Sequence, residues 1–173
     1  YVDILENNNF KNLIDKSATN KINQLFFNNF INRIALDEET ILKSNYLKKK
    51  RFLKCDSSDP YEREIHRIEN LQFKIKDPIE LGKDNMVDWR ERYYKHYCYL
   101  EPNEIDIYVS NMVQHYIRGL KWVTEYYFDK CPAWRWYYPY DIPPFINDIN
   151  KFRINFNKIS FELESPLSQF EQL

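Results

Sequence analysis

Apolar residues return every three or four positions through residues 104–130, the most regular stretch of the chain. This period is that of an α-helix with one buried face. Glu104 and Asp106 stand where negative charge favours the positive N-terminal end of a helix. We therefore predict a long buried helix over Glu104–Lys130. The residues of its apolar face are Ile105, Val109, Met112, Val113, Tyr116, Ile117, Leu120, Val123 and Tyr127.

Weaker patterns of the same kind predict shorter helices elsewhere. Loops separate them, and the clearest loop is Cys55–Tyr61, which is rich in Asp, Ser and Pro. Residues 158–164 alternate between polar and apolar side chains, which favours a strand. We predict a mainly α fold with minor β. The helices are expected within residues 1–16, at 22–36, from Asp37–Thr40 onward, at 61–74 and at 146–152.

The segment after the long helix, Cys131–Phe145, combines prolines with aromatic residues. Its residues 133–145 contain three prolines, which exclude a regular helix or strand, and six aromatic side chains, which need burial or a ligand. Gly119, in the preceding helix, costs about 1 kcal/mol relative to alanine. Close packing of another backbone against this glycine is the expected reason.

Composition narrows the function classes. The 173 residues carry a net charge of −1, which argues against a free-standing nucleic-acid-binding module, since such modules neutralise phosphates. The three cysteines are widely spaced, so we expect no zinc site and an intracellular location, cytoplasmic or nuclear. No apolar run is long enough to span a membrane. Because the chain starts at Tyr1 rather than Met, we expect a segment of a longer protein.

Side chains suited to catalysis are scattered along the chain. No tight cluster of carboxylates suits a metal ion, and neither a nucleophile elbow nor a glycine-rich phosphate loop occurs. Two segments, Trp89–Tyr94 and Trp134–Tyr138, instead interleave arginines with aromatic rings. Bases stack on such rings at about 1–3 kcal/mol each. From the residues alone, an aromatic core edged by arginines is favoured over a base-binding surface.

In and between these two segments, the chain resembles the XRN family of 5′→3′ exoribonucleases. The family pattern has a W-[KR]-x-[KR]-Y-Y block, a Y-[IV]-x-G-L-x-W-V-x-x-Y-Y helix, a W-x-W-Y-Y-P-Y loop and a closing F-E-Q-L. Order and spacing agree over about Ile79–Leu173. The matching residues are Trp89–Tyr94, Tyr116–Val123, Tyr126, Tyr127, Trp134–Tyr140, Pro144, Phe145, Asp148, Pro166, Leu167 and Phe170–Leu173.

The resemblance implies the second conserved region of such an enzyme, a helical region that encloses the active site. It also implies that Mg²⁺ and the pocket for RNA with a 5′-monophosphate belong to the N-terminal conserved region, the partner of this segment. No catalytic or metal-binding residue is therefore expected here. We expect Trp136 to stack on entering bases, with Trp134 as the alternative, and Arg135 and Tyr138 to contact substrate. The further candidates, which would line the channel, are Asp148, Asp141 and Arg92.

The resemblance also suggests a division of the chain. Residues 75–173 are expected to form the XRN-like helical domain. Residues 1–74 are expected to be a helical connecting segment, because no motif in them is recognisable.

Two departures from the family pattern support an alternative function. Ala133 stands where the family has serine, and Asp141 stands where it has histidine, which places a negative charge beside the expected RNA path. A catalytically inactive XRN-like scaffold, structural or RNA-binding, is thus the alternative to an active, processive exoribonuclease. The Asn-, Lys- and Ile-rich composition suggests a viral or protist source.

Overall fold

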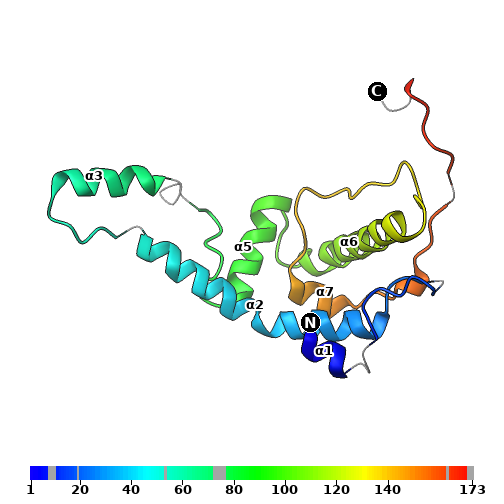
Figure 1. The fold of residues 1–173 in the computed structure, drawn as a ribbon. Helices are drawn as coiled ribbons and strands as arrows, with labels where there is room; N and C mark the ends of the chain where they lie inside the picture. Colours follow the sequence, from blue (N-terminus) through cyan, green and yellow to red (C-terminus); the bar gives the residue numbers. More distant parts are fainter. Residues whose placement is uncertain (8–10, 19, 53, 72–76, 163, 171–173) are drawn as a thin grey trace. The chain divides into compact units, whose positions relative to one another are not determined.

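The computed structural model describes residues 1–173 apart from 8–10, 19, 53, 72–76, 163 and 171–173. The described chain is helical, which confirms the predicted fold class (Figure 1). The helices expected at 104–130 and 146–152 correspond to α6 and α7. The elements are α1 (Val2–Asn7), α2 (Gln24–Phe52), α3 (Pro60–Glu69), α5 (Met86–Cys98), α6 (Ile105–Phe128), α7 (Ile146–Phe152) and the 3₁₀-helix η1 (Phe156–Lys158).

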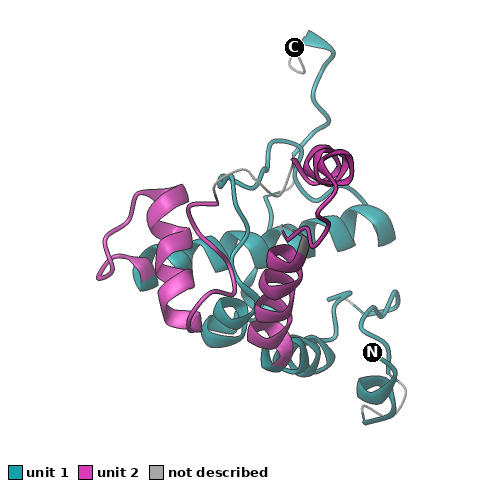
Figure 2. Cartoon of the chain, turned by 90° about the vertical axis from the view of Figure 1, so that its left-hand side faces the viewer, with its two compact units in different colours: residues 1–36, 106–173 teal, residues 37–105 magenta. Residues whose placement is uncertain are grey.

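The chain forms two compact units (Figure 2). Unit 1 comprises residues 1–36 and 106–173, and unit 2 comprises residues 37–105. The aromatic segment Cys131–Phe145 and the greater part of α6 therefore belong to unit 1. The division of the chain by family similarity at residue 74 stays a prediction.

One continuous helix, α2, replaces the two that the sequence predicted. Asp37–Thr40 does not start a new helix, because it contains neither proline nor glycine and its outer residues are exposed to solvent. Glu39 also pairs with Lys43 one turn later, with 2.7 Å between Oε1 and Nζ. Such a pair at i,i+4 supports a helix across this point.

Local capping chemistry sets the start of α3. The Asp59 carboxylate accepts a hydrogen bond from the Tyr61 N–H (2.9 Å), and Pro60 occupies the first turn, where no N–H is needed. The loop predicted at Cys55–Tyr61 is thus confirmed up to Asp59, and its last two residues belong to α3. The predicted helix end at 72–74 lies outside the described residues.

The strand predicted at residues 158–164 is not formed by the described part of that segment. Lys158 belongs to η1, and the following described residues are irregular. The Ser160 carbonyl bonds to a side chain and not to the backbone of a neighbouring strand, since it accepts a hydrogen bond from Arg118 Nη2–H of α6 (3.1 Å). The β pairing seen among the described residues is an isolated antiparallel bridge between Ile14 and Ile22.

The core of unit 1 is built on the apolar face of α6. Phe156 of η1 meets the ring of Phe27 in α2 edge-on, with centroids 4.9 Å apart. The Phe156 N–H also donates to Gln24 Oε1 (2.8 Å), so both the ring and the backbone of η1 are fixed against α2. The fully buried side chains of unit 1 include Phe26, Val109, Met112, Val113, Ile117 and Phe156.

In unit 2, a tight loop at residues 77–84 precedes α5. The Arg92 side chain of α5 donates to the carbonyls of Ile79 (2.7 Å) and Lys83 (3.2 Å). Gly82 has φ +85° and lies against the α2 backbone at Leu42. The loop is therefore held by hydrogen bonds from one side and by close backbone packing from the other.

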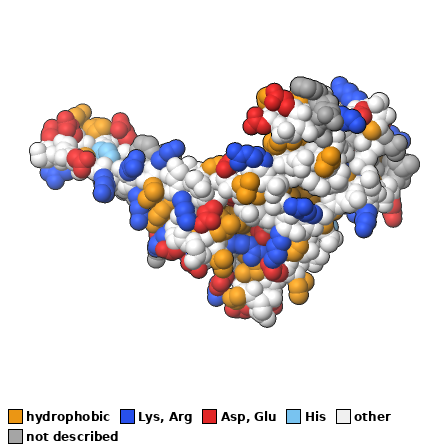
Figure 3. Space-filling view, turned by 90° about the horizontal axis from the view of Figure 1, so that it is seen from below, with side chains coloured by type: hydrophobic (Ala, Val, Ile, Leu, Met, Phe, Trp, Pro, Cys, Tyr) orange, Lys and Arg blue, Asp and Glu red, His pale blue; other side chains and the backbone are white. Residues whose placement is uncertain are grey.

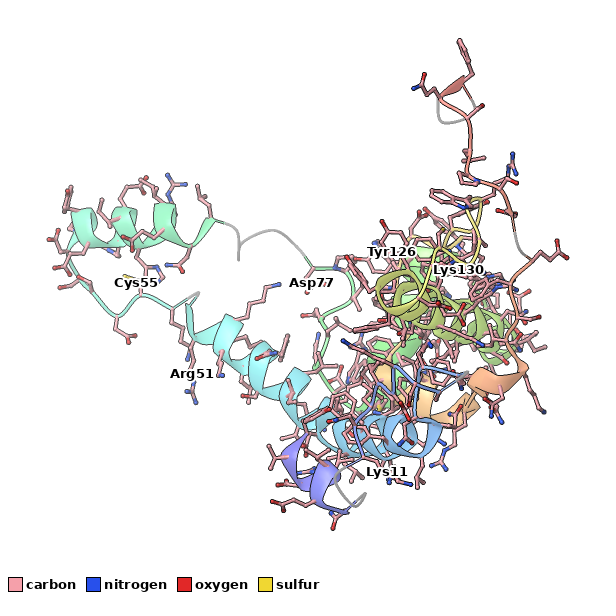
Figure 4. The ribbon with its side chains drawn as sticks, turned by 45° about the vertical axis from the view of Figure 1, so that its right-hand side comes forward. Lys11, Arg51, Cys55, Asp77, Tyr126 and Lys130 are labelled. Atoms are coloured by element: carbon pink, nitrogen blue, oxygen red, sulfur yellow. The ribbon has the colours of Figure 1, made fainter. Side chains whose placement is uncertain are left out.

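The Asp77 carboxylate starts this loop and is labelled in Figure 4. It accepts hydrogen bonds from the N–H groups of Ile79 (3.0 Å) and Glu80 (3.1 Å) and from Lys49 Nζ (3.2 Å). Partial burial acts to raise the pKa of Asp77. The Glu80 and Ile79 N–H groups and the Lys49 ammonium outweigh burial and hold the pKa below its ordinary value.

Replacing Asp77 with asparagine is expected to destabilise the protein at pH 7 by about 1 kcal/mol or less, because water screens this group. The lowered pKa means that the carboxylate stabilises the fold above its unfolded pKa, and that this contribution is lost as pH falls through the folded pKa. The stability gap between wild type and variant should therefore close below about pH 4. Urea denaturation between pH 3 and 7 measures the gap, with the exposed Asp56→Asn as control. A gap that is constant with pH would contradict the prediction.

Candidate nucleic-acid interface

The aromatic segment Cys131–Phe145 turns back after α6 and runs beside that helix toward α7 (Figure 1). No helix or strand forms in it, as its prolines predicted. Successive residues of the segment contact α6 residues that are progressively earlier in the chain. The segment therefore lies along the helix and runs antiparallel to it. From the end of α6 toward its start, the contacting pairs are Trp122 with Ala133, Gly119 with Trp136, Tyr116 with Tyr138, and His115 with Tyr140.

Most of the α6 residues that receive this segment form a stripe separate from the apolar one. They lie three, four or seven positions apart, which is the spacing of one helix face. Sequence reasoning missed this stripe, because it mixes His, Gly, Trp and Tyr and does not stand out as hydrophobic. The spacing itself was the available signal. The stripe consists of Tyr108, His115, Gly119, Trp122 and Tyr126.

Trp136 is the half-buried centre of the contact. Its indole stacks on Trp122 at 6.1 Å and 26°, and meets Phe161 edge-on at 6.3 Å. A Cβ on Gly119 would lie 2.8 Å from Trp136 Cη2. Gly119 thus makes room for an indole ring, and the expectation that it faces another backbone was wrong.

The neighbouring candidate residues divide into exposed and structural ones. Trp134 is 41% exposed, and Arg135 is exposed while its N–H donates to Glu164 Oε2 (2.9 Å). The Tyr138 hydroxyl donates to the Ile142 carbonyl (2.8 Å), and its ring meets Tyr116 edge-on. Tyr138 therefore holds the proline-rich turn, whereas Trp134 and Arg135 are presented to solvent.

A cavity of about 370 Å³ opens beside Trp136. Arg118, Arg135 and Trp136 contribute two cations and a ring to its lining, and Glu162 and Glu164 contribute two carboxylates. The cavity thus offers a stacking surface and hydrogen-bond donors, with negative charge on one wall. Such a combination suits a base better than a phosphate.

The three candidate channel residues occupy different settings. Asp148, in the first turn of α7, is 2% exposed, and Asp141 is exposed within the aromatic segment. Arg92 belongs to unit 2, where backbone carbonyls of residues 79–83 accept its donors and Asp84 lies 3.7 Å from Nη1. In unit 1 the structure brings together Trp134, Trp136, Arg135 and Tyr138. Their roles toward RNA stay predictions.

Two tyrosines near the end of α6 differ from expectation. Tyr127 was predicted to lie on the buried face of this helix, but it is 74% exposed, and the neighbouring Tyr126 is 48% exposed. Tyr126, labelled in Figure 4, stacks on Trp122 with centroids 5.2 Å apart and 7° between the planes. It extends the ring stack from the interior to the surface. Tyr127, one helical position or about 100° further on, meets the Tyr126 ring edge-on with centroids 5.3 Å apart.

The described residues contain no group of three His, Cys, Asp or Glu side chains able to hold a metal ion. They therefore do not fit a magnesium site of their own. In the same part of the chain, no helix has the length and apolar character needed to cross a membrane. On the face drawn in Figure 3, acidic and basic side chains are intermixed.

Lys121 ties α6 to the segment that follows η1. Its side chain is 12% exposed, and its ammonium donates to the carbonyls of Phe156 (3.1 Å) and Ile159 (2.7 Å), with Glu125 at 3.6 Å. Lys121→Met removes these charge-assisted bonds and leaves two carbonyls short of a donor. We expect a loss of about 2–3 kcal/mol in the free energy of unfolding.

Thermal melting followed by circular dichroism measures this loss, expected as a decrease of about 5–10 °C in Tm. Lys130→Met is the control, because Lys130 follows α6 and is exposed (Figure 4). Equal Tm values for the two variants would show that the Lys121 bonds do not stabilise the fold.

Comparison with known proteins identifies the family. Residues 4–173 match the family described as the Xrn1 helical domain. The chain belongs to this family. The match to the Xrn1 helical domain also covers residues 4–74, in which the sequence motifs were not recognisable.

Relatives of this Xrn1 helical domain are named as exoribonucleases. The chain is 31% identical over 159 residues to 5′-3′ exoribonuclease 2 of Schizosaccharomyces pombe, which covers 87% of this chain and 15% of that protein. It is 30% identical over 135 residues to 5′-3′ exoribonuclease 1 of Homo sapiens, and this match covers 75% of this chain and 8% of that protein. The chain thus spans at most about one sixth of the length of these relatives.

Proposed function

We propose that the full-length protein is a 5′→3′ exoribonuclease that degrades RNA with a 5′-monophosphate processively. The Xrn1 helical domain match over residues 4–173 carries this proposal, together with relatives named for that activity. In this proposal the chain encloses the active site, and Mg²⁺ is held by the N-terminal conserved region. The chain's own residues bind and orient RNA.

The aromatic segment supports a base-stacking role for this chain. Trp136 is fixed from one side by Trp122 and from the edge by Phe161, and it lines the 370 Å³ cavity. A ring held in one orientation loses little entropy when a base stacks on it. Trp136 is therefore the first candidate for the stacking wall, and the exposed Trp134 is the second.

Degradation assays with the full-length protein test the proposal. RNAs of one sequence carry a 5′-monophosphate, a 5′-hydroxyl or a cap, and the shortening of a 3′-labelled strand is followed on a gel. The 5′-monophosphate RNA should be degraded processively and the other two should persist. Equal degradation of all three, or degradation of none, would overturn it.

A catalytically inactive scaffold is the second candidate. Asp141 stands in place of the family's histidine, and Glu162 and Glu164 line the cavity beside Trp136. These carboxylates repel phosphate, which favours a structural role over RNA passage. Under this alternative, none of the three RNAs is shortened by the wild-type protein, and Trp136→Ala changes stability alone.

A further inference from the structure

A second cavity in unit 1, of about 470 Å³, has an unusual charge pattern. Gln114, His115 and Arg118 of α6 form one wall, and Arg153, Lys158 and Ser160 form the other. Three of these residues are cationic, and neither Asp nor Glu contributes to the lining. We call this cavity the basic groove. The whole sequence has a net charge of −1, so such a carboxylate-free cluster is a local feature.

Two buried nitrogen atoms of the basic groove lack hydrogen-bond partners. They are His115 Nδ1 and Arg118 Nε. A buried polar atom without a partner costs about 1–3 kcal/mol. The Arg118 guanidinium is otherwise fixed, because Nη2–H donates to Ser160 and the group lies 4.9 Å over the Phe161 ring. A donor that is held rigidly and has no partner is the feature expected at a site where a ligand supplies the hydrogen-bond acceptor.

The opposite wall carries exposed cations near a strained backbone. Arg153 ends α7 with φ +34°, a conformation that costs a residue with a side chain about 1–2 kcal/mol. Its guanidinium donates to groups of Asn150 (3.1 and 3.4 Å), which are neutral. Lys158 is exposed at the end of η1. Both cations line the groove.

The ligand that matches this groove is a phosphodiester. Arginine presents two parallel donors to phosphate oxygens, lysine adds a point charge, and no carboxylate opposes them. The volume lies within the range of small-ligand sites and accommodates about one nucleotide unit. A carboxylate ligand would use the same cations, so the test must separate the two.

The basic groove adjoins the cavity at Trp136, because Arg118 and Ser160 line both. Proteins that bind single strands combine a cationic path for the backbone with rings for the bases. We propose that the basic groove binds the phosphates of single-stranded RNA next to the base that stacks at Trp136. This inference rests on the proposed action on RNA and adds a path for its backbone.

The test uses Arg153→Gln with Lys158→Gln in the full-length protein. Both side chains are exposed, so the fold should persist. The control is Lys16→Gln with Lys130→Gln, which removes the same charge from exposed positions of unit 1 outside the groove. Fluorescence polarisation measures Kd for a labelled 5′-hydroxyl oligouridylate in EDTA, between 50 and 200 mM salt. The single variant Lys158→Gln serves if the double variant does not fold.

The groove variant should bind about tenfold more weakly near 0.1 M salt. For this variant the slope of log Kd against the logarithm of the salt concentration should be smaller by about 1.4, because each of the two lost phosphate contacts accounts for about 0.7. The control should match wild type. Equal binding by the two double variants would overturn the inference. So would an equal loss of binding to a glutamate-rich peptide, because that outcome marks a general anion site.

The outcome is separable from that of the proposed function. Degradation that depends on the 5′-phosphate, together with unchanged RNA binding by the groove variant, overturns the groove alone. Absence of degradation, together with weakened RNA binding by the groove variant, overturns the enzyme and leaves the groove standing.

Discussion

Replacing Gly82 with alanine is expected to lower Tm by about 6–12 °C. Its φ of +85° is strained for a residue with a side chain, at about 1–2 kcal/mol. The new Cβ would also lie 2.2 Å from the Leu42 carbonyl oxygen, and a backbone atom inside a helix cannot move aside. Overpacking of this kind costs about 1–3 kcal/mol. Together these give about 3 kcal/mol or more, at about 2–4 °C per kcal/mol for a chain of this size.

Gly119→Ala is the matched control for this prediction. In α6 the alanine gains about 1 kcal/mol of helix propensity, and its Cβ would meet the tip of the Trp136 side chain at 2.8 Å. We expect a small change in Tm together with a shift in tryptophan fluorescence. If Gly119→Ala lowers Tm as much as Gly82→Ala does, the distinction between a backbone and a side-chain neighbour is wrong.

Replacing Trp136 with alanine is expected to slow RNA turnover by the full-length protein about 5- to 150-fold at subsaturating RNA. The lost stacking on a base is worth about 1–3 kcal/mol, which converts to this range at 1.4 kcal/mol per tenfold. Because Trp136 also contacts Trp122 and Phe161, the variant should lose stability as well. Initial rates on 5′-monophosphate RNA and urea denaturation measure the two effects.

Trp134→Ala decides between the two tryptophans. Trp134 is 41% exposed, so its removal should hardly change stability. If Trp136 is the stacking wall, the Trp134 variant should turn over RNA at a rate near that of wild type. A large rate loss in Trp134→Ala combined with a normal rate in Trp136→Ala would assign the wall to Trp134.

The helical elements with regular apolar spacing were predictable from the sequence. The buried face of α6 followed from periodicity as far as Leu120, whereas Val123 and Tyr127, predicted on the same face, are exposed. The short α7 was also predicted. The division of α2 was wrong because acidic residues at 37–40 resemble a helix start. They also fit an exposed stretch of helix when neither proline nor glycine is present. Periodicity alone does not separate the two cases.

The candidate site was predictable in its aromatic residues and not in its geometry. The motif order singled out Trp136, but the contact with Gly119 and the stack on Trp122 depend on how a proline-rich segment folds back. The basic groove was missed for the same reason. Arg118 and Lys158 are 40 positions apart in the chain and each alone is an ordinary surface cation.

The stripe on α6 that receives the aromatic segment restricts how this helix can change length in evolution. A single inserted residue between Tyr108 and Gly119 would rotate all later positions by about 100°. Gly119 and Trp122 would then face away from the segment that Tyr108 still faces. Insertions and deletions inside α6 should therefore be absent among folded variants. Insertions and deletions after Phe128 leave the positions of the stripe on the helix unchanged. A library with single-residue insertions along α6, sorted for folded protein, would reveal this boundary.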